Sequence, residues 1–258
     1  MKLRDTVVTV LSVTRQAAIL KTVRHNGEVS VTGLAQELGV SASTIRRDLD
    51  ALSQRGELRR VRGGSVVEAD PVPFDEVARV GGADREAVAR RAAQLVPDGA
   101  VVVLDIGTTT ARLAHHLRGR AITVITASLA AVRELETQDS PEVVVLGGVL
   151  RRTYHSLVGS LTTDALSLLR ADMCFMSMSG IGPDGMVMDD TGMEVPVKRA
   201  MLAAADRRVA LATRSKFPGT GMVAVARLGA GDALVTNAES DRAALDSLRQ
   251  AGVEVILA

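Results

Sequence analysis

Apolar residues in the first quarter of the chain recur with the spacing of three short helices. The pattern predicts a first helix over residues 14–26 and a second of about two turns that ends at Gly39. A third helix is expected to begin after Ser41, a good N-cap residue, and to end before Gly56. One face of this third helix is apolar, with Ile45, Leu49 and Leu52. Three such helices with a glycine turn before the last are typical of a helix-turn-helix.

Two short runs of alternating apolar and polar residues follow the third helix. They cover residues 58–61 and 65–67, and a turn of Arg62, Gly63 and Gly64 separates them. Paired runs around a Gly-Gly turn predict a β-hairpin. A hairpin in this position is the wing of a winged helix-turn-helix, so we expect residues 14–67 to form a domain of that type.

The pattern changes after residue 67. Residues 68–82 contain two prolines and a Gly-Gly pair, a composition typical of a linker. Over residues 83–258, short runs rich in Val, Ile and Leu alternate with helical segments. This alternation predicts an α/β domain with a mostly parallel sheet that helices cover. The expected strands include residues 101–104, 122–125, 143–146, 174–178, 209–212, 233–236 and 253–257.

The length of 258 residues and the composition suit a folded protein with two domains of unequal size. Hydrophobic residues make up 47% and charged residues 24%, which excludes a disordered or a collagen-like chain. The single cysteine, Cys174, permits no intrachain disulfide, so we expect a cytoplasmic protein. No apolar stretch is long enough to span a bilayer, and residues 1–13 are expected to form a mobile extension rather than a signal peptide.

The net charge of +1 is small for a protein that binds a polyanion, but the charge is distributed unevenly. Residues 14–67 hold nine basic and five acidic residues, a net charge of +4, whereas residues 75–258 carry a net charge of −2. Six of the nine basic residues lie between positions 46 and 62, on the third helix and the wing. This arrangement predicts contact with the phosphates of DNA. The alternative is a solvated basic face on a small helical domain.

The third helix is the expected recognition helix. If its apolar residues face the core, Ser43, Arg46 and Arg47 project from the outer side near the helix N-terminus, where such helices contact base edges. We expect Thr44 to contact a phosphate or to support the turn. Arginine pairs bidentately with guanine, and the wing arginines are expected to contact phosphates or the minor groove. The predicted DNA-binding residues are Ser43, Thr44, Arg46, Arg47, Arg59, Arg60, Arg62 and Gly63.

The segment that begins at Val29 closely resembles the winged helix-turn-helix of the DeoR family of bacterial transcriptional regulators. It reads VSVTGLAQELGVSASTIRRDLDALSQRGELRRVRGGSVV. The resemblance continues through LDIGTTTARLAHHL, VVVLGGVLRRTYHSLVG, EVPVKRAML and RSKF, and so covers nearly all of the chain after residue 14. It implies a transcriptional repressor, usually of a sugar-catabolic operon. It also implies a C-terminal domain that resembles ribose-5-phosphate isomerase and binds a phosphorylated sugar or a related metabolite.

The turn that follows the strand at residues 101–104 is a candidate anion site. Asp105 ends the strand, and Gly107 leaves room for a phosphate beside the backbone. A helix then opens with Thr108, Thr109 and Thr110. Free N–H groups at a helix N-terminus bind anions, and the carboxyl ends of parallel strands are the usual place for ligands. The alternative is an ordinary helix cap, but the family resemblance favours a phosphate site in which Asp105 accepts hydrogen bonds from sugar hydroxyls.

Three charged residues complete the predicted ligand site. Glu194 and Lys198 are four positions apart, the spacing of a surface salt bridge. Pro196, however, favours the first turn of a helix, which places both charged residues near its N-terminus and lets them point into the site. Lys216 follows the strand at residues 209–212, where a phosphate, a hydroxyl or solvent is an equally good partner. The resemblance favours both lysines as ligand contacts.

The sequence indicates no metal site and no cofactor. The four histidines have no metal-like spacing with carboxylates, and no Walker A, HExxH or GxSxG motif is present. We therefore expect a regulator without enzymatic activity that binds its DNA operator as a homo-oligomer, since symmetric operators are read by symmetric proteins. The alternative is a sugar-phosphate isomerase fused to a basic domain. Against it, Val197-Lys198-Arg199 stands where the resembling isomerases carry Arg-Glu-Lys, which displaces the carboxylate that such a reaction needs as a base.

Overall fold

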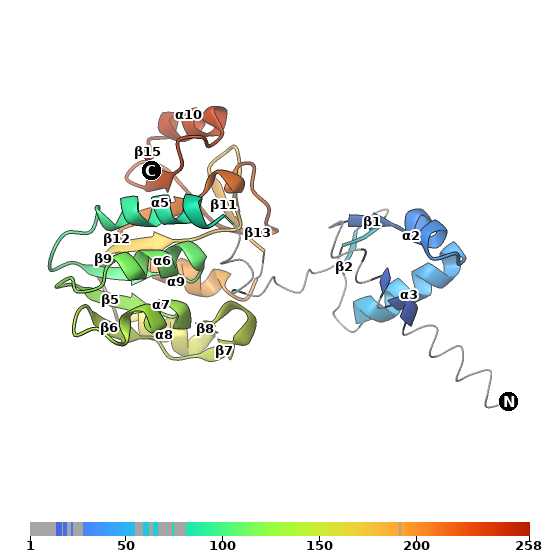
Figure 1. Cartoon of the computed structure of the whole chain (residues 1–258), viewed down its shortest axis with the longest axis horizontal. Coiled ribbons are helices and arrows are strands. Elements are labelled where there is room, and N and C mark those ends of the chain that lie inside the picture. Colours follow the sequence, from blue (N-terminus) through green and yellow to red (C-terminus); the bar gives the residue numbers. More distant parts are fainter. Residues whose placement is uncertain are drawn as a thin grey trace. The chain divides into compact units, whose positions relative to one another are not determined.

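The computed structural model describes residues 14–16, 18, 19, 22, 28–54, 59–61, 64–66, 74, 81–190 and 192–258. The chain divides into two compact units, Met1–Pro73 and Phe74–Ala258 (Figure 1). The predicted extension, residues 1–13, lies outside the described residues, as does most of the predicted linker, residues 68–82. The limits predicted for the two domains, 14–67 and 83–258, therefore stay predictions.

The N-terminal unit has the predicted elements of a winged helix-turn-helix. Residues 14–16, 18, 19 and 22 are helical. The elements that follow are β1 (Glu28–Ser30), α2 (Val31–Glu37), α3 (Ala42–Gln54), β2 (Arg59–Val61) and β3 (Gly64–Val66). The predicted hairpin is confirmed, because β2 and β3 pair antiparallel, and β1 pairs with the other side of β3. The three predicted core residues of α3, Ile45, Leu49 and Leu52, are fully buried. They form one cluster with Ile19 and Leu34 from the two preceding helices.

Polar contacts fix the start and the middle of α3. The Ser41 hydroxyl accepts a hydrogen bond from the backbone N–H of Thr44 at 3.1 Å, as expected of an N-cap residue. Arg15, in the first helical segment, pairs with the buried carboxylate of Asp48, with 2.5 Å between Nε and Oδ2. Gln16 Nε2 donates to the other oxygen of Asp48 at 3.1 Å. The position of α3 is therefore set by this ion pair as well as by the apolar core.

A parallel sheet of seven strands forms the centre of the C-terminal unit (Figure 1). The strand order is β15-β14-β12-β9-β4-β5-β6, and every neighbouring pair is parallel. The bounds are β4 (Val101–Leu104), β5 (Thr123–Thr126), β6 (Glu142–Val145), β9 (Ala171–Met176), β12 (Ala205–Ala212), β14 (Ala233–Thr236) and β15 (Glu254–Leu257). The predicted α/β class with a mostly parallel sheet is confirmed.

Helices cover both faces of this sheet. One face packs against α5 (Gly82–Ala93), α6 (Thr108–His116) and α7 (Leu129–Leu135), and the other against α8 (Ser160–Ser167), α9 (Val195–Ala203) and α10 (Arg242–Gln250). In β4, Val102 and Leu104 face the first layer and Val103 faces the second, so all three are buried. None of the helices in the described part of the chain has the length and apolar character that a membrane span requires.

Two small antiparallel sheets that the sequence does not predict lie apart from this parallel sheet in the hydrogen-bond pattern. β7 (Val149–Arg151) and β8 (Ser156–Val158) form a hairpin around the 3-10 helix Arg152–Tyr154. A small sheet has the order β10 (Gly180–Ile181), β11 (Met186–Asp189) and β13 (Val223–Arg227). The strand expected at residues 174–178 ends at Met176, so Ser177 lies in the loop that enters this small sheet.

Candidate functional site

The outer face of α3 carries the predicted recognition residues. Ser43, Arg46 and Arg47 are exposed, and Thr44 is half-buried. The Ser41 hydroxyl lies 2.8 Å from the Ser43 hydroxyl and 2.9 Å from the Thr44 hydroxyl. Thr44 therefore supports the turn, one of the two roles predicted for it, and the two arginines extend the charged surface of the helix into solvent.

The predicted wing residues are described only in part. Arg59 and Arg60 lie in β2, in register with Val66 and Ser65 of β3. Arg62 and Gly63, at the predicted tip, lie outside the described residues. A DNA-binding role for the helix and wing residues stays a prediction at the level of single side chains.

The strand order of the large sheet reverses between β4 and β9. The chain proceeds from β4 through β5 to β6 on one side, and from β9 through β12 and β14 to β15 on the other. In an α/β sheet, the crevice outside the carboxyl ends of the strands at such a reversal is the usual ligand site. Asp105 directly follows β4 and Ser177 directly follows β9 at this point. The Asp105 N–H donates to the carbonyl of Phe175 at 3.0 Å, which holds the two exits together.

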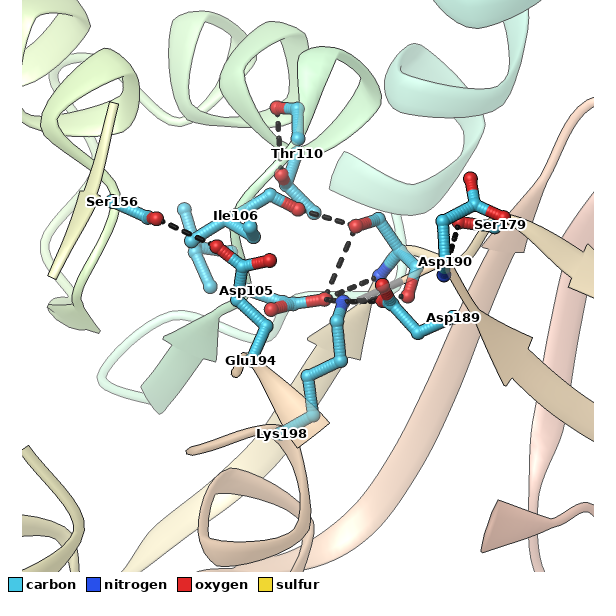
Figure 2. Close-up of polar contacts among 12 residues, drawn as sticks. Asp105, Ile106, Thr110, Ser156, Ser179, Asp189, Asp190, Glu194 and Lys198 are labelled. Carbon is cyan, nitrogen blue, oxygen red and sulfur yellow. Dashed lines mark hydrogen bonds and ion pairs between the residues drawn. The ribbon is translucent and has the colours of Figure 1, made fainter. Parts of the chain in front are cut away.

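A buried ion pair forms the floor of this site (Figure 2). The ammonium of Lys198 on α9 contacts Asp105 Oδ2, and it lies 3.4 Å from Asp189 Oδ2 at the end of β11. It also donates to the carbonyl of Ser177 at 3.0 Å, and the Ser177 N–H donates to Asp105 Oδ2 at 2.9 Å. Lys198 is 2% exposed, Asp105 1% and Asp189 8%. The positive charge of Lys198 is therefore balanced within the protein.

The electrostatic surroundings keep Lys198 protonated. Burial by itself lowers the pKa of this ammonium, but the charges of Asp105 and Asp189 raise the pKa above its ordinary value. Lys198 is therefore a buried, paired cation and not an unpaired one that awaits a ligand.

The N-terminus of α6 lies at the same strand ends. Gly107 is its N-cap residue, with φ 128° and ψ 168°, and no side chain caps the helix. A Cβ atom on Gly107 would lie 2.8 Å from the Ser177 hydroxyl, so only glycine fits beside β9. The Thr110 hydroxyl donates to the Gly107 carbonyl at 2.9 Å (Figure 2), whereas within the described part of the chain the hydroxyls of Thr108 and Thr109 form no hydrogen bond. The first turn of α6 thus offers N–H groups and two hydroxyls to an anion.

Glu194 lies at the start of α9, as Pro196 in the first turn predicts. Its carboxylate is 2% exposed, accepts a hydrogen bond from the Ser156 hydroxyl at 2.8 Å (Figure 2), and lies 2.5 Å from Arg151 Nη1. The guanidinium of Arg151 also lies over the ring of Tyr154, 4.4 Å from its centroid. Glu194 therefore connects α9 to the β7–β8 hairpin.

Lys216 ends the 3-10 helix Arg214–Lys216, which follows β12. Its side chain is half-buried, and within the part of the chain that the structure describes its ammonium has no hydrogen bond or ion pair. Burial lowers the pKa of Lys216, and the charge of Arg85 on α5 lowers it further, against the opposing charges of Asp190 and Asp189. A half-buried cation beside a second cation is stabilised by an anion, so the surroundings of Lys216 favour an anion, and its role as a ligand contact stays a prediction.

The sequence does not predict several side chains that the structure places near these residues. They are Arg151, Tyr154, Ser156, Ser177, Ser179, Asp189 and Asp190. Ser177 lies inside the strand predicted at residues 174–178, and because β9 ends at Met176 it leaves the strand in the same way as Asp105 leaves β4. The Asp190 N–H donates to the Ser179 hydroxyl at 3.1 Å (Figure 2), but both residues belong to antiparallel segments whose place in the fold the pattern does not predict.

We expect the phenol of Tyr154 to titrate near pH 12 in the folded protein. Burial raises its pKa from 10.0 to about 12, and the charge of Glu194 acts in the same direction. Because the folded state favours the neutral phenol, this contribution to stability is complete below pH 10.0 and is lost as the pH rises to about 12. Tyr154 is the single tyrosine and the chain has no tryptophan, so phenolate absorbance follows it alone. A native midpoint near that of free tyrosine would contradict its half-buried position beside Glu194.

Two family models match the chain. They are the DeoR-like helix-turn-helix domain, over residues 15–70, and the DeoR C terminal sensor domain, over residues 82–238. The chain is 30% identical over 227 residues to the glycerol-3-phosphate regulon repressor of Escherichia coli (strain K12), which covers 87% of this chain and 90% of that protein.

Two further relatives match over a greater length. The HTH-type transcriptional repressor GlcR of Bacillus subtilis (strain 168) is 31% identical over 251 residues, 94% of this chain and 95% of that one. The L-fucose operon activator of Haemophilus influenzae is 30% identical over 239 residues, 92% of this chain and 94% of that one. A solved ribose 5-phosphate isomerase A from Methanocaldococcus jannaschii aligns with a TM-score of 0.39 and 19% identity over 51% of this chain and 52% of that chain. The fold of the C-terminal unit is established by its own strands and helices and not by this distant likeness.

Proposed function

The chain belongs to the DeoR family of transcriptional regulators, and on this basis we propose that it represses a sugar-catabolic operon and that a phosphorylated sugar or a related metabolite releases it from its operator. The recognition helix α3 and the wing bind the operator duplex. The names of two relatives, a repressor of a glycerol-3-phosphate regulon and an activator of an L-fucose operon, support a polyol or sugar operon. Two of the three relatives are repressors, which supports repression as the sign of regulation.

The observation that carries the proposed effector is the combination of anion-binding and hydroxyl-binding groups at the reversal between β4 and β9. The first turn of α6 and the ammonium of Lys216 both favour a phosphate group. Carboxylates of Asp189, Asp190 and Glu194 line the other part of the site, and ionised carboxylates accept hydrogen bonds from hydroxyl groups. A molecule with one phosphate and several hydroxyls fits both halves.

We propose that this site binds without turnover. An isomerase needs a carboxylate that is free to take a proton from a substrate carbon. Glu194 is held by Ser156 and Arg151, and Asp105 and Asp189 are held by Lys198, so none of these three buried carboxylates is in that position. Conversion of ribose 5-phosphate to its ketose by the purified protein would overturn this part of the proposal.

Release from the operator is a linkage effect. An effector that binds more tightly to the arrangement with low operator affinity shifts the population toward that arrangement, and by no more than its differential affinity. We propose that the acting species is a homo-oligomer, because a winged helix reads one half-site and symmetric operators contain two.

Replacing Lys216 with methionine is the sharpest test of the effector site. The substitution removes a charge-assisted contact to phosphate, so we expect glycerol 3-phosphate, ribose 5-phosphate or glucose 6-phosphate, whichever binds the wild type, to bind about 10- to 150-fold more weakly. Isothermal titration calorimetry measures this affinity, and operator binding without the compound should be unchanged. Arg90→Met, which removes an exposed cation from α5, serves as the control. Equal affinity of the Lys216→Met and Arg90→Met variants would exclude Lys216 from the site.

A further inference from the structure

The turn of the β7–β8 hairpin contacts both the ligand site, through Arg151 and Ser156, and Phe74, through His155. We call this segment, residues 149–158, the flap; it comprises β7, the 3-10 helix Arg152–Tyr154, His155 and β8. Backbone hydrogen bonds anchor its second strand: the Leu129 N–H donates to the His155 carbonyl at 2.8 Å, and the Leu157 N–H donates to the Ala127 carbonyl at 2.9 Å. The flap is thus tied to the start of α7 by its backbone, and it reaches α9 and Phe74 through side chains.

On the side of the ligand site, Glu194 holds the flap to α9. Arg151 and Ser156 come from the two strands of the flap, and both contact the carboxylate of Glu194. The carbonyl of the same glutamate accepts the backbone N–H of Lys198 at 2.9 Å, within the helix that supplies the floor of the site. A ligand group that forms a new contact with Glu194 or Arg151 therefore competes with the contact that fastens the flap.

His155 holds the flap in an unfavourable conformation. Its φ is 50°, the single positive value for a residue other than glycine among those that the structure describes. Its Nδ1 atom is buried and has no hydrogen-bond partner in the described part of the chain. A left-handed backbone and an unpaired buried nitrogen both disfavour this arrangement, so the surrounding contacts must impose it.

From the same turn of the flap, the His155 ring stacks on the ring of Phe74, with centroids 5.3 Å apart and planes at 29°. Phe74 is the first residue of the C-terminal unit, and the preceding residue, Pro73, is the last of the N-terminal unit. A change at His155 therefore acts on the residue at which the two units are covalently joined.

We propose that the flap transmits effector binding from Glu194 to Phe74, and through Phe74 to the segment that joins the sensor to the DNA-binding unit. This inference rests on the proposed function of effector release. In the effector-free protein, Arg151 and Ser156 hold Glu194, and His155 is kept on Phe74. A sugar phosphate that engages Glu194 or Arg151 loosens this contact, and His155 then relaxes and leaves Phe74. By linkage, the stacked state is the one with high operator affinity.

The test uses the full-length protein and the variants Phe74→Ala, Arg151→Met and Arg152→Met. Arg152 is the control, since its side chain is an exposed neighbour on the same flap. Operator affinity is measured with and without glycerol 3-phosphate, ribose 5-phosphate or glucose 6-phosphate, on a duplex that the wild type selects from a random library. Fluorescence of Tyr154, the single tyrosine, measures binding of the same compounds without DNA. For the wild type we expect the compound that binds to weaken operator affinity by about 5- to 150-fold.

In Phe74→Ala, we expect the compound to bind with nearly the wild-type Kd, while the ratio of operator Kd values with and without it falls to about one. Arg151→Met should weaken operator binding even without a compound, and Arg152→Met should behave as the wild type. Wild-type release in Phe74→Ala would overturn the flap proposal and leave the proposed function intact. If none of the three compounds releases the wild type from its operator, the proposed function is wrong for these compounds. Independently of that result, an operator affinity of Arg151→Met equal to that of the wild type would overturn the flap proposal.

Discussion

Replacing Lys198 with methionine is expected to lower the free energy of unfolding of the C-terminal unit by about 3–5 kcal/mol. The substitution leaves the carboxylates of Asp105 and Asp189 buried beside each other without their cation. For a unit of this size, the loss corresponds to a fall in Tm of roughly 6–20 °C. Urea unfolding followed by the fluorescence of Tyr154 measures it, because this residue lies in the C-terminal unit and is the single tyrosine.

Lys216→Met is the matched control, since it removes the same charge from a half-buried side chain that has no ion-pair partner among the residues that the structure describes. We expect it not to lower the free energy of unfolding, because burial and the charge of Arg85 disfavour the Lys216 ammonium in the folded state. Replacing Asp105 with asparagine together with Lys198→Met should recover part of the loss, because one stranded carboxylate is then neutral. Equal stability of Lys198→Met and Lys216→Met would show that the buried ion pair does not stabilise the fold.

Arg46→Ala and Arg47→Ala are each expected to weaken operator binding by about 1–3 kcal/mol, or roughly 5- to 150-fold, if the arginine reads a base edge. Both side chains are exposed on α3 above a core of Ile45 and Leu49, so their removal leaves the fold unchanged. Fluorescence anisotropy with a labelled operator duplex measures the affinity, and competition with a scrambled duplex separates specific from non-specific binding. Arg90→Ala, an exposed change in the other unit, is the control.

A different result is expected from the wing. Arg60→Ala should weaken binding to every duplex by a similar factor and reduce the slope of log Kd against log salt by about one, as for the loss of a phosphate contact. Specific loss for Arg46 or Arg47 and uniform loss for Arg60 would support the assignment of base and phosphate contacts. Unchanged anisotropy curves for both α3 variants would contradict α3 as the recognition helix.

The sequence predicts the central strands best where burial is complete. Residues 101–104 and 233–236 are predicted as strands and coincide with β4 and β14. These strands lie inside a parallel sheet covered on both faces, so they appear in the sequence as unbroken apolar runs. By contrast, Val149 and Leu150 of β7 are 65% and 41% exposed, and β10 has two residues. Segments this short and exposed have no period that a sequence pattern can reveal.

The predicted ligand site divides in the same way. Gly107 and the three threonines that follow lie within one strand-to-helix turn, and a local motif is enough to find them. The contact between Ser156 and Glu194 joins residues 38 positions apart, and that between Lys198 and Asp105 joins residues 93 apart. In the sequence, Lys198 appears as a cation for a ligand. Its burial against two carboxylates depends on tertiary packing that no local pattern encodes.

The buried group of Asp105, Lys198 and Asp189 also determines how this sensor can be redesigned. Each of the three charges depends on the others, so we expect these positions to accept substitutions jointly and to reject them singly. Lys216 has no ion pair among the residues that the structure describes, and changes there should alter which compound is recognised while the domain still folds. A library that varies Lys216 and keeps the three buried charges and the pair of Arg151 and Glu194 fixed is therefore a suitable source of biosensors for new metabolites.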